Sequence, residues 1–126
     1  MTSPRPLSTE LDALREAASG FAEERDWAQF HTPKDLALSL TLEAAELAAL
    51  MQWKHGEALE AHLRANREAL GDELADVLWY TLLIAHYQDI DLAEAFARKL
   101  EKNAAKYPVE KSRGSAAKYT ELAGGE

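Results

Sequence analysis

The chain has 126 residues, a formal net charge of −8 and no cysteine. The missing cysteines exclude disulfide scaffolds, thiolate zinc sites and cysteine nucleophiles, and the acidic balance without a dense Lys/Arg cluster disfavours binding to duplex DNA or RNA. The opening residues lack the apolar core of a signal peptide, and no apolar run reaches the length of a membrane span, so we expect a cytoplasmic protein with no membrane partner. Scarce strand-like alternation predicts an all-α fold, and the length fits one domain over 1–126.

The first predicted helix follows a loose arm at 1–7, which holds two prolines and no periodic pattern. Ser8 or Thr9 can cap this helix, with Asp12 completing a capping box. An apolar stripe on one face then continues the helix to about Trp27.

The second predicted helix has a clear start signal. Thr32 stands at the cap, Pro33 at the first helical position and Asp35 three residues after the cap. The apolar sequence continues to about Trp53. Gly56 can supply a left-handed residue near the stop.

A short connection and a third helix follow. Residues 57–66 are polar and alanine-rich, which fits either a short exposed helix or a helical extension of the connection. Asn66 is a candidate cap for a helix over about 67–88, whose centre is apolar on all sides. This helix and the equally apolar 36–53 have too little polar face for a lone bundle, which predicts an oligomer.

The last predicted helix begins at a second capping box. Asp91 and Glu94 have the required spacing, and the helix should end at Tyr107, ahead of a proline. The final stretch 109–126 is rich in Ser, Gly, Ala and Lys, and we expect it to be mostly non-helical. Together these elements predict a four-helix-bundle-type domain with a short extra helix.

Two acidic pairs lie inside the apolar helices. Glu43 and Glu46 stand three residues apart, as do Glu73 and Asp76. Residues three apart lie on one helix face, so each pair aims two carboxylates in one direction. Carboxylates that converge in an apolar setting need a cation, since they would otherwise take up protons or repel one another. The alternative is that these acids are partly exposed at a subunit boundary.

Two further pairs with the same spacing are internal controls. Glu23 with Asp26, and Glu57 with Glu60, have polar neighbours, so we expect them on solvated helix faces. The apolar surroundings therefore mark the metal site, because the spacing alone does not distinguish the pairs.

The ligand chemistry indicates Mg²⁺, with Mn²⁺ as a substitute, because hard carboxylates without His or Cys favour these ions. A helical di-iron site would need Glu three residues before His. None of the four histidines has this neighbour, so a di-iron oxidase is disfavoured.

Aromatic residues extend the acid-bearing faces. Trp53 stands seven residues after Glu46, Tyr80 stands four after Asp76, and Trp27 ends the first helix. Each ring alone fits simple core packing. The two rings on the acid-bearing faces, Trp53 and Tyr80, together favour a planar ligand, a nucleobase, stacked beside the metal.

Three polar residues share one face of the last long helix by their spacing: Lys99, Asn103 and Lys106. They fit either a solvated face or partners for the phosphates and sugar of a nucleoside triphosphate. In the second case they would complete a nucleotide site.

These features resemble the MazG-like all-α nucleoside triphosphate pyrophosphohydrolases, and the closer match is to the dCTP pyrophosphatase branch. The resemblance rests on E-x-x-E and E-x-x-D, 26 residues apart within apolar helices, and on several flanking segments. These segments are FAEERDWAQFHTPKDL (21–36), LEAAELAALMQWK (42–54), DELADVLWY (72–80), KYP (106–108) and KYTEL (118–122). The acid motif alone would not separate this branch from dimeric dUTPases or phosphoribosyl-ATP pyrophosphatases.

The resemblance implies Mg²⁺-dependent hydrolysis of a (deoxy)nucleoside triphosphate, dCTP or a modified dCTP, to the monophosphate and pyrophosphate, as house-cleaning of the nucleotide pool. It also implies a homotetramer built as a dimer of dimers. The matching positions are Glu43, Glu46, Glu73 and Asp76 for metal and catalysis, Trp27 and Trp53 for the base, His31 in the same segment as Trp27, Tyr80 beside the sugar, and Lys99 and Asn103 for phosphate and sugar. Ala18 stands where the family has a base-reading histidine, which leaves the choice of base open.

Other functions remain open at this point. A nucleotide-binding regulator would retain the site without turnover, and a related dUTPase-type pyrophosphatase would act on another base. A purely structural oligomerisation module would bind no nucleotide and would tolerate removal of the four acids.

Overall fold

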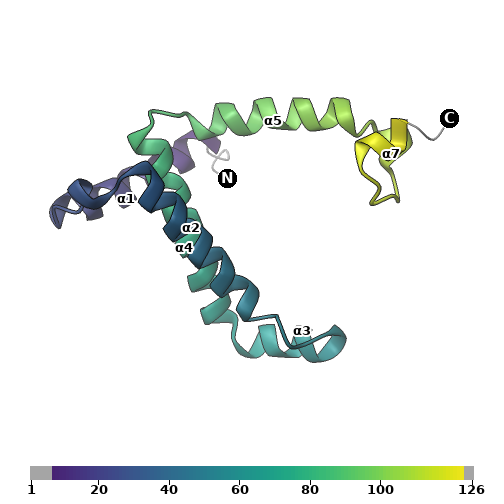
Figure 1. Cartoon of the computed structure of the whole chain (residues 1–126), viewed down its shortest axis with the longest axis horizontal. Helices are drawn as coiled ribbons and strands as arrows, with labels where there is room; N and C mark the ends of the chain where they lie inside the picture. The colour runs from purple at the N-terminus through teal and green to yellow at the C-terminus, as the bar shows by residue number, and fades with distance from the viewer. Residues whose placement is uncertain (1–6, 124–126) are drawn as a thin grey trace, which may run out of the picture. The chain divides into compact units, whose positions relative to one another are not determined.

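The structure is a computed structural model that describes residues 7–123. The described residues contain no strand, which confirms the all-α prediction, and none of the described helices is long and apolar enough to cross a membrane. The elements are α1 (Leu7–Glu24), the 3₁₀ helix η1 (Ala28–Phe30), α2 (Pro33–Ala49), α3 (Gly56–Ala65), α4 (Arg67–Tyr87), α5 (Leu92–Lys106), α6 (Val109–Ser112) and α7 (Tyr119–Ala123) (Figure 1).

Contacts within the chain group it into two compact units. The first ends at Ile90 and contains α1 to α4 with η1; the second begins at Asp91 and contains α5 to α7. A single domain over 1–126 therefore stays a prediction. The loose arm predicted for 1–7 lies outside the described residues, except Leu7, which begins α1.

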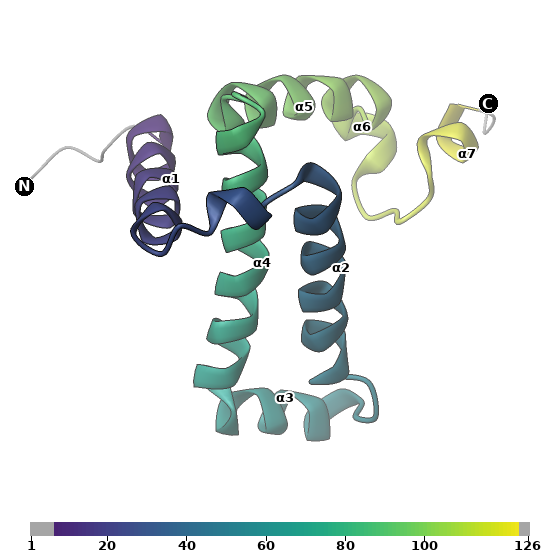
Figure 2. The same ribbon diagram turned by 60° about the vertical axis from the view of Figure 1, so that its left-hand side comes forward.

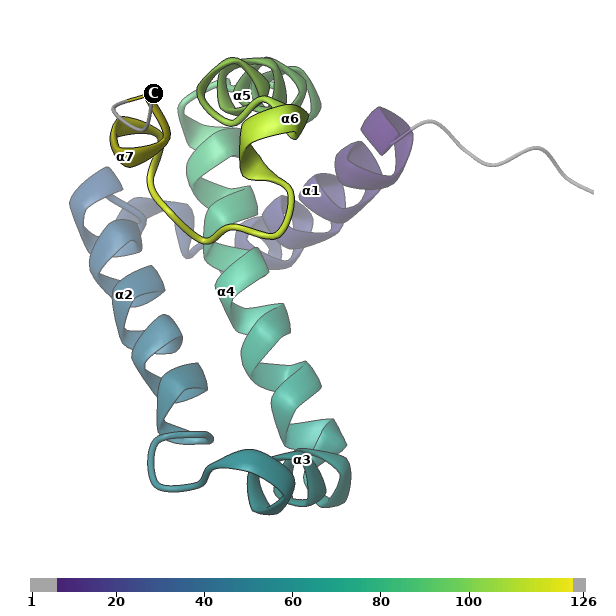
Figure 3. The same ribbon diagram turned by 90° about the vertical axis from the view of Figure 1, so that its right-hand side faces the viewer.

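Helix α4 is the central helix of the first unit. It lies beside α2 in antiparallel orientation, and α3 crosses one end of this pair (Figures 2 and 3). Helix α1 packs against α4 on a different side from α2. Helix α4 therefore has packing partners on more than one of its sides.

The buried core surrounds the C-terminal half of α4. Leu83 is its one fully buried large side chain among the described residues, and burial of a leucine contributes about 1.5–3 kcal/mol. Helix α1 offers small side chains here, Ala18, Ala22 and the buried Ser19. The buried apolar residues are Ala18, Ala22, Leu36, Leu82, Leu83 and Ala85.

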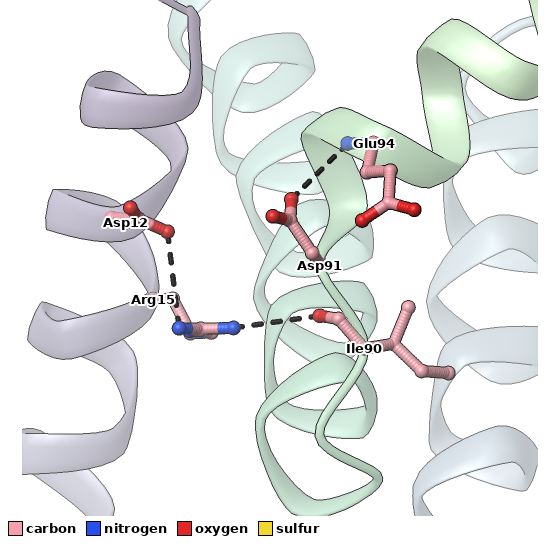
Figure 4. Close-up of polar contacts among 5 residues, drawn as sticks. All are labelled: Asp12, Arg15, Ile90, Asp91 and Glu94. Atoms are coloured by element: carbon pink, nitrogen blue, oxygen red, sulfur yellow. Dashed lines mark hydrogen bonds and ion pairs between the residues drawn. The ribbon is translucent and has the colours of Figure 1, made fainter.

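A polar contact also links α1 to the end of α4. Arg15 donates a hydrogen bond from its guanidinium to the carbonyl oxygen of Ile90 at 3.4 Å, and another guanidinium nitrogen lies 3.8 Å from Asp12 (Figure 4). Exposed contacts of this kind contribute little to stability, so the apolar core carries the packing.

Two predicted helix starts are confirmed. The Thr32 side chain accepts a hydrogen bond from the backbone N–H of Asp35 at 3.1 Å, and α2 begins at Pro33. In the second unit, Asp91 accepts from the N–H of Glu94 at 3.1 Å, and α5 begins one residue later (Figure 4). In both, a side-chain oxygen satisfies a backbone donor that the first turn leaves unpaired.

The predicted bounds of the first helix were wrong at both ends. Ser8 and Thr9 lie inside α1, so neither is its cap. The helix ends at Glu24 because Asp26 adopts a left-handed conformation, with φ of 54°. The N–H of Trp27 then bonds to the carbonyl of Ala22 at 3.0 Å and that of Asp26 to Glu23 at 3.0 Å, which is the Schellman arrangement.

The second helix also ends earlier than predicted, at Ala49. After it, the backbone N–H of Met51 bonds three residues back, to Ala48 at 3.0 Å, and that of Lys54 bonds to Met51 at 3.3 Å. These tight turns replace the helical pattern before Trp53. Gly56 does adopt the predicted left-handed conformation, with φ of 55°, and begins α3.

The connection 57–66 forms a short helix, which is one of its two predicted forms. Asn66 does not cap α4 as predicted, because its side chain makes no capping hydrogen bond there. It instead donates to the carbonyl of His62 at 2.8 Å and so closes the end of α3. The helix predicted over 67–88 is confirmed as Arg67–Tyr87.

The tail was predicted to be mostly non-helical. It instead contains α6 and α7, two helices of four and five residues. Two backbone N–H groups, of Lys111 and Ser112, bond to the carbonyl of Pro108 at 3.1 and 2.9 Å and form α6. The ring of Tyr119 in α7 packs edge-on against Tyr107 at 6.1 Å, which gives the tail a contact that local sequence did not indicate.

Large apolar side chains lie exposed on α2 and α4. Leu38 is 53% exposed, Leu42 65% and Leu74 50%. A monomer seldom leaves such a surface in water. This exposure is what the prediction of an oligomer requires.

Candidate active site

The packing of α2 against α4 brings three predicted ligands together. A carboxylate oxygen from each of Glu43, Glu73 and Asp76 lies within 4.8 Å of the others. Glu46 lies outside this set of three, but after burial its charge is the next cause of the raised pKa of both Glu43 and Glu73. The structure therefore places all four predicted acids in one neighbourhood, with Glu46 at its margin.

Two of these carboxylates have an unsatisfied oxygen. Glu43 and Glu73 are half-buried, and their Oε2 atoms are buried without a hydrogen-bond partner in the described part of the chain. Glu46 and Asp76 are exposed. Buried polar atoms without partners are uncommon in folded proteins, and a cation bound between the helices would give both oxygens a partner.

The electrostatics point the same way. Burial, followed by the charges of Glu46 and Asp76, raises the pKa of Glu43 to about 7. Burial is also the first cause of the raised pKa of Glu73, with Glu46 and Asp76 next. None of the ion pairs found among the described residues involves these acids. The cluster therefore has an excess of negative charge that a cation would neutralise.

The donor set fits a hard divalent cation. It consists of carboxylate oxygens, which suit Mg²⁺ and Mn²⁺. Asp76 and Glu46 are exposed, so a cation here could be reached from solvent and by a phosphate ligand. Such a site can hold a cation between two helices and present it to a triphosphate and a water molecule.

The control pairs behave as predicted. Glu57 and Glu60 are exposed on α3, and Glu23 and Asp26 are exposed at the end of α1. Asp26 accepts a local hydrogen bond from Gln29 at 3.0 Å. The same spacing thus gives a solvated face where the neighbours are polar.

The aromatic residues beside the acids have different settings. Tyr80 is half-buried on α4, one turn after Asp76, as the spacing indicated. Trp53 is 82% exposed in the turns that follow α2. The argument that Trp53 continues the helical face of Glu46 was wrong, because α2 ends before it. Its role as a base contact stays a prediction.

The segment between α1 and α2 holds two further predicted ligand contacts. Trp27 is 41% exposed, at the start of η1, and its ring lies edge-on to Phe21 at 5.7 Å and to His31 at 6.5 Å. His31 is half-buried, and its Nδ1 lies 3.1 Å from the hydroxyl of Tyr87. Trp27 and His31 therefore share one aromatic cluster.

The predicted phosphate and sugar contacts lie in the second unit. Lys99, Asn103 and Lys106 are all exposed on α5. The ammonium of Lys106 lies 4.9 Å from the centre of the Tyr119 ring. Their contact with a nucleotide stays a prediction.

Sequence reasoning missed two residues of the aromatic cluster. Tyr87 bonds to His31, and Trp79 lies edge-on to Phe21 at 5.3 Å. Tyr87 could have been found, because it stands seven residues after Tyr80 and so shares its helix face. Its contact with a segment 56 residues away left no local signal.

Comparison with known proteins gives a consistent result. A sequence profile of the MazG-like family matches residues 38–122. The dCTP pyrophosphatase 1 of Bos taurus is 44% identical over 125 residues, which cover 96% of this chain and 74% of that protein. The dCTP pyrophosphatase 1 of Homo sapiens is 43% identical over 122 residues, which cover 95% of this chain and 70% of that protein.

One solved structure has the same fold as this chain. A pyrophosphatase from Archaeoglobus fulgidus DSM 4304 matches with a TM-score of 0.69 and 38% sequence identity. The match covers 86% of this chain and 97% of that chain. These matches confirm the resemblance predicted from the acid pairs and their flanking segments.

Proposed function

Because the chain belongs to the MazG-like family, we propose that it hydrolyses dCTP or a modified dCTP to the monophosphate and pyrophosphate, with Mg²⁺ as the cofactor. The observation that carries this proposal is the carboxylate cluster of Glu43, Glu73 and Asp76, with two buried oxygens that lack partners. The relatives named dCTP pyrophosphatase 1 support the choice of substrate.

The three clustered acids would hold the cation. A divalent cation bound there would supply Lewis-acid chemistry toward the triphosphate and the attacking water. Glu46 is exposed and adjacent to Glu43 and Glu73, which suits it to accept the proton of that water. The reaction needs no covalent intermediate, and the chain has no cysteine to provide a thiolate nucleophile.

The remaining predicted residues would bind the nucleotide. Trp27 has an exposed ring that can stack on a base, and Tyr80 lies one turn from Asp76, close enough to line the same site. A base-contact role for Trp53 fits its exposed ring. For Lys99, Asn103 and Lys106 the proposal is contact with phosphates and sugar. It relies on the charge of the two lysines, on the amide of Asn103 and on their shared face of α5.

The proposed assembly is a homotetramer, a dimer of dimers, in the cytoplasm. The exposed leucines on α2 and α4, Leu38, Leu42 and Leu74, support burial against another copy. Light scattering should give the mass of four chains. A charged substitution, Leu42→Glu, should shift it toward smaller species; a monomeric wild type would contradict the assembly.

A pyrophosphate-release assay tests the activity. Purified protein is incubated with each common (d)NTP and with 5-modified dCTPs, with Mg²⁺ or with EDTA. We expect fastest release from dCTP or a modified dCTP and none with EDTA. Preference for a purine triphosphate would refute the substrate, and preference for dUTP would favour a dUTPase-type enzyme.

Binding measurements separate the remaining alternatives. Mg²⁺-dependent dCTP binding without pyrophosphate release would indicate a nucleotide-binding regulator. Absence of any Mg²⁺-dependent nucleotide binding would indicate a structural module. The raised pKa of Glu43 argues against the structural module, since a purely structural helix pair gains nothing from clustered acids.

A further inference from the structure

The hydrogen bond between His31 and Tyr87 connects two distant parts of the first unit. Tyr87 is in the last turn of α4, and His31 is in the non-helical segment between η1 and α2. The hydroxyl of Tyr87 lies 3.1 Å from Nδ1 of His31, and the two rings meet edge-on with centroids 5.7 Å apart. Within the described part of the chain, the His31 ring has no other hydrogen bond.

Tyr87 is attached to a rigid support. It follows Leu83 by one helical turn, and Leu83 is fully buried. His31 instead belongs to a segment with backbone hydrogen bonds between residues close in sequence. One example is the bond from its own N–H to the carbonyl of Ala28 at 3.1 Å. A bond from a rigid helix to a loop residue restricts the loop residue more than the helix.

Tyr87 remains a neutral phenol. Burial, and then the charge of Glu23, raise the pKa of its hydroxyl above the ordinary value. A neutral phenol can donate its proton to a ring nitrogen. If Nδ1 of His31 accepts this proton, the imidazole proton resides on Nε2, at the opposite side of the ring.

His31 lies beside the exposed Trp27. Their rings are edge-on with centroids 6.5 Å apart. The two rings are therefore neighbours in the aromatic cluster.

We propose that Tyr87 is a positioning residue of the nucleotide site, which holds Nδ1 of His31 so that the Nε2–H group can donate to an acceptor atom of the bound nucleotide. This inference rests on the proposed function, because it assumes that His31 and Trp27 contact the nucleotide. Tyr87 itself does not need to touch the substrate.

The test is Tyr87→Phe, which removes the hydroxyl and retains the ring. Long-range ¹H–¹⁵N NMR of histidine-labelled protein, assigned by the signals lost in His31→Ala, reports the tautomer of His31. We expect the Nε2–H form in the wild type and a mixture of tautomers in Tyr87→Phe. The KM for dCTP should rise about three- to tenfold, the range of one hydrogen bond, with kcat within about twofold.

Two controls separate positioning from general effects. Tyr107→Phe also removes a phenol from an aromatic pair, and it should change neither the His31 spectrum nor KM. In a His31→Ala background, Tyr87→Phe should have no further effect on KM, because its effect passes through His31.

Two results would overturn the proposal: an unchanged His31 spectrum in Tyr87→Phe, or an equal rise in KM with and without His31. If the wild type shows no Mg²⁺-dependent dCTP hydrolysis, the proposed function fails by that measurement. The spectrum of the free protein then still decides whether Tyr87 sets the tautomer of His31.

Discussion

Helix α3 and the pair α2/α4 that it connects carry acid pairs with the same spacing and opposite surroundings. On α3, Glu57 and Glu60 are exposed. Between α2 and α4, Glu43 and Glu73 are half-buried, with an unpaired buried oxygen on each. Spacing alone therefore only places two carboxylates on the same helix face. Packing of a second helix against them creates the charge excess that a metal site requires.

The largest difference between the two regions should be in activity. Glu43→Gln or Glu73→Gln keeps the shape of the side chain and removes a ligand charge. Mutation of a residue that only hydrogen-bonds to a metal ligand lowers metal affinity or activity about 10–100-fold. Since Glu43 and Glu73 would be ligands themselves, we expect kcat to fall by at least about 100-fold. Glu57→Gln and Glu60→Gln should stay within about twofold. Equal effects in both regions would contradict the metal site.

The second difference should appear as a pH dependence. The folded-state pKa of Glu43 is about 7, raised from 4.5, so folding favours the protonated acid. Its contribution to stability is complete below about pH 4.5 and is lost as pH rises through 7. Without metal, the free energy of unfolding should therefore fall between these values.

Mg²⁺ should reverse this trend, because a metal ligand must be deprotonated. Below pH 7 the apparent affinity for Mg²⁺ should fall about tenfold per pH unit for one released proton. Thermal unfolding with and without Mg²⁺ at several pH values measures both effects. Glu43→Gln should weaken the pH dependence, with a remainder from the raised pKa of Glu73, and Glu57→Gln should leave it unchanged; the opposite pattern would rule out Glu43 as a source.

A smaller difference should separate the starts of α2 and α3. Thr32 caps α2 through a side-chain hydrogen bond, whereas His55 stands at the cap of α3 without one. Thr32→Ala should lower the free energy of unfolding by about 1 kcal/mol. His55→Ala should change it by less than about 0.5 kcal/mol. Urea denaturation measures both, and a larger loss at His55 would contradict the assigned cap.

Local signals in the sequence were sufficient for the elements that position the metal site. The cap at Thr32 and the apolar helices around Glu43 and Glu73 follow from hydrogen bonding and periodicity within a few residues. The early end of α2 did not follow, because tight turns replace the helix before Trp53 without a glycine or proline at that point. The contact of Tyr87 with His31 depends on the packing of α4 against a distant segment.

The turns that end α1 and α4 each place an aspartate where it lowers the stability of the folded protein. Asp26 and Asp89 both have φ of 54°, and the N–H of Ile90 bonds to Ala85 at 2.9 Å as that of Trp27 does to Ala22. Each aspartate thus pairs a strained backbone with a negative charge at the negative end of a helix dipole. At Asp89 both effects oppose folding, whereas at Asp26 the hydrogen bond from Gln29 offsets part of them.

Replacement by asparagine would remove the negative charge, and asparagine adopts the left-handed conformation as readily as aspartate does. Asp89→Asn should raise the free energy of unfolding by about 0.3–1 kcal/mol, as measured in urea. A loss of stability would show that the Asp89 carboxylate has a favourable role at the helix end. Substitutions at these two turns are therefore a starting point for raising the free energy of unfolding of this protein.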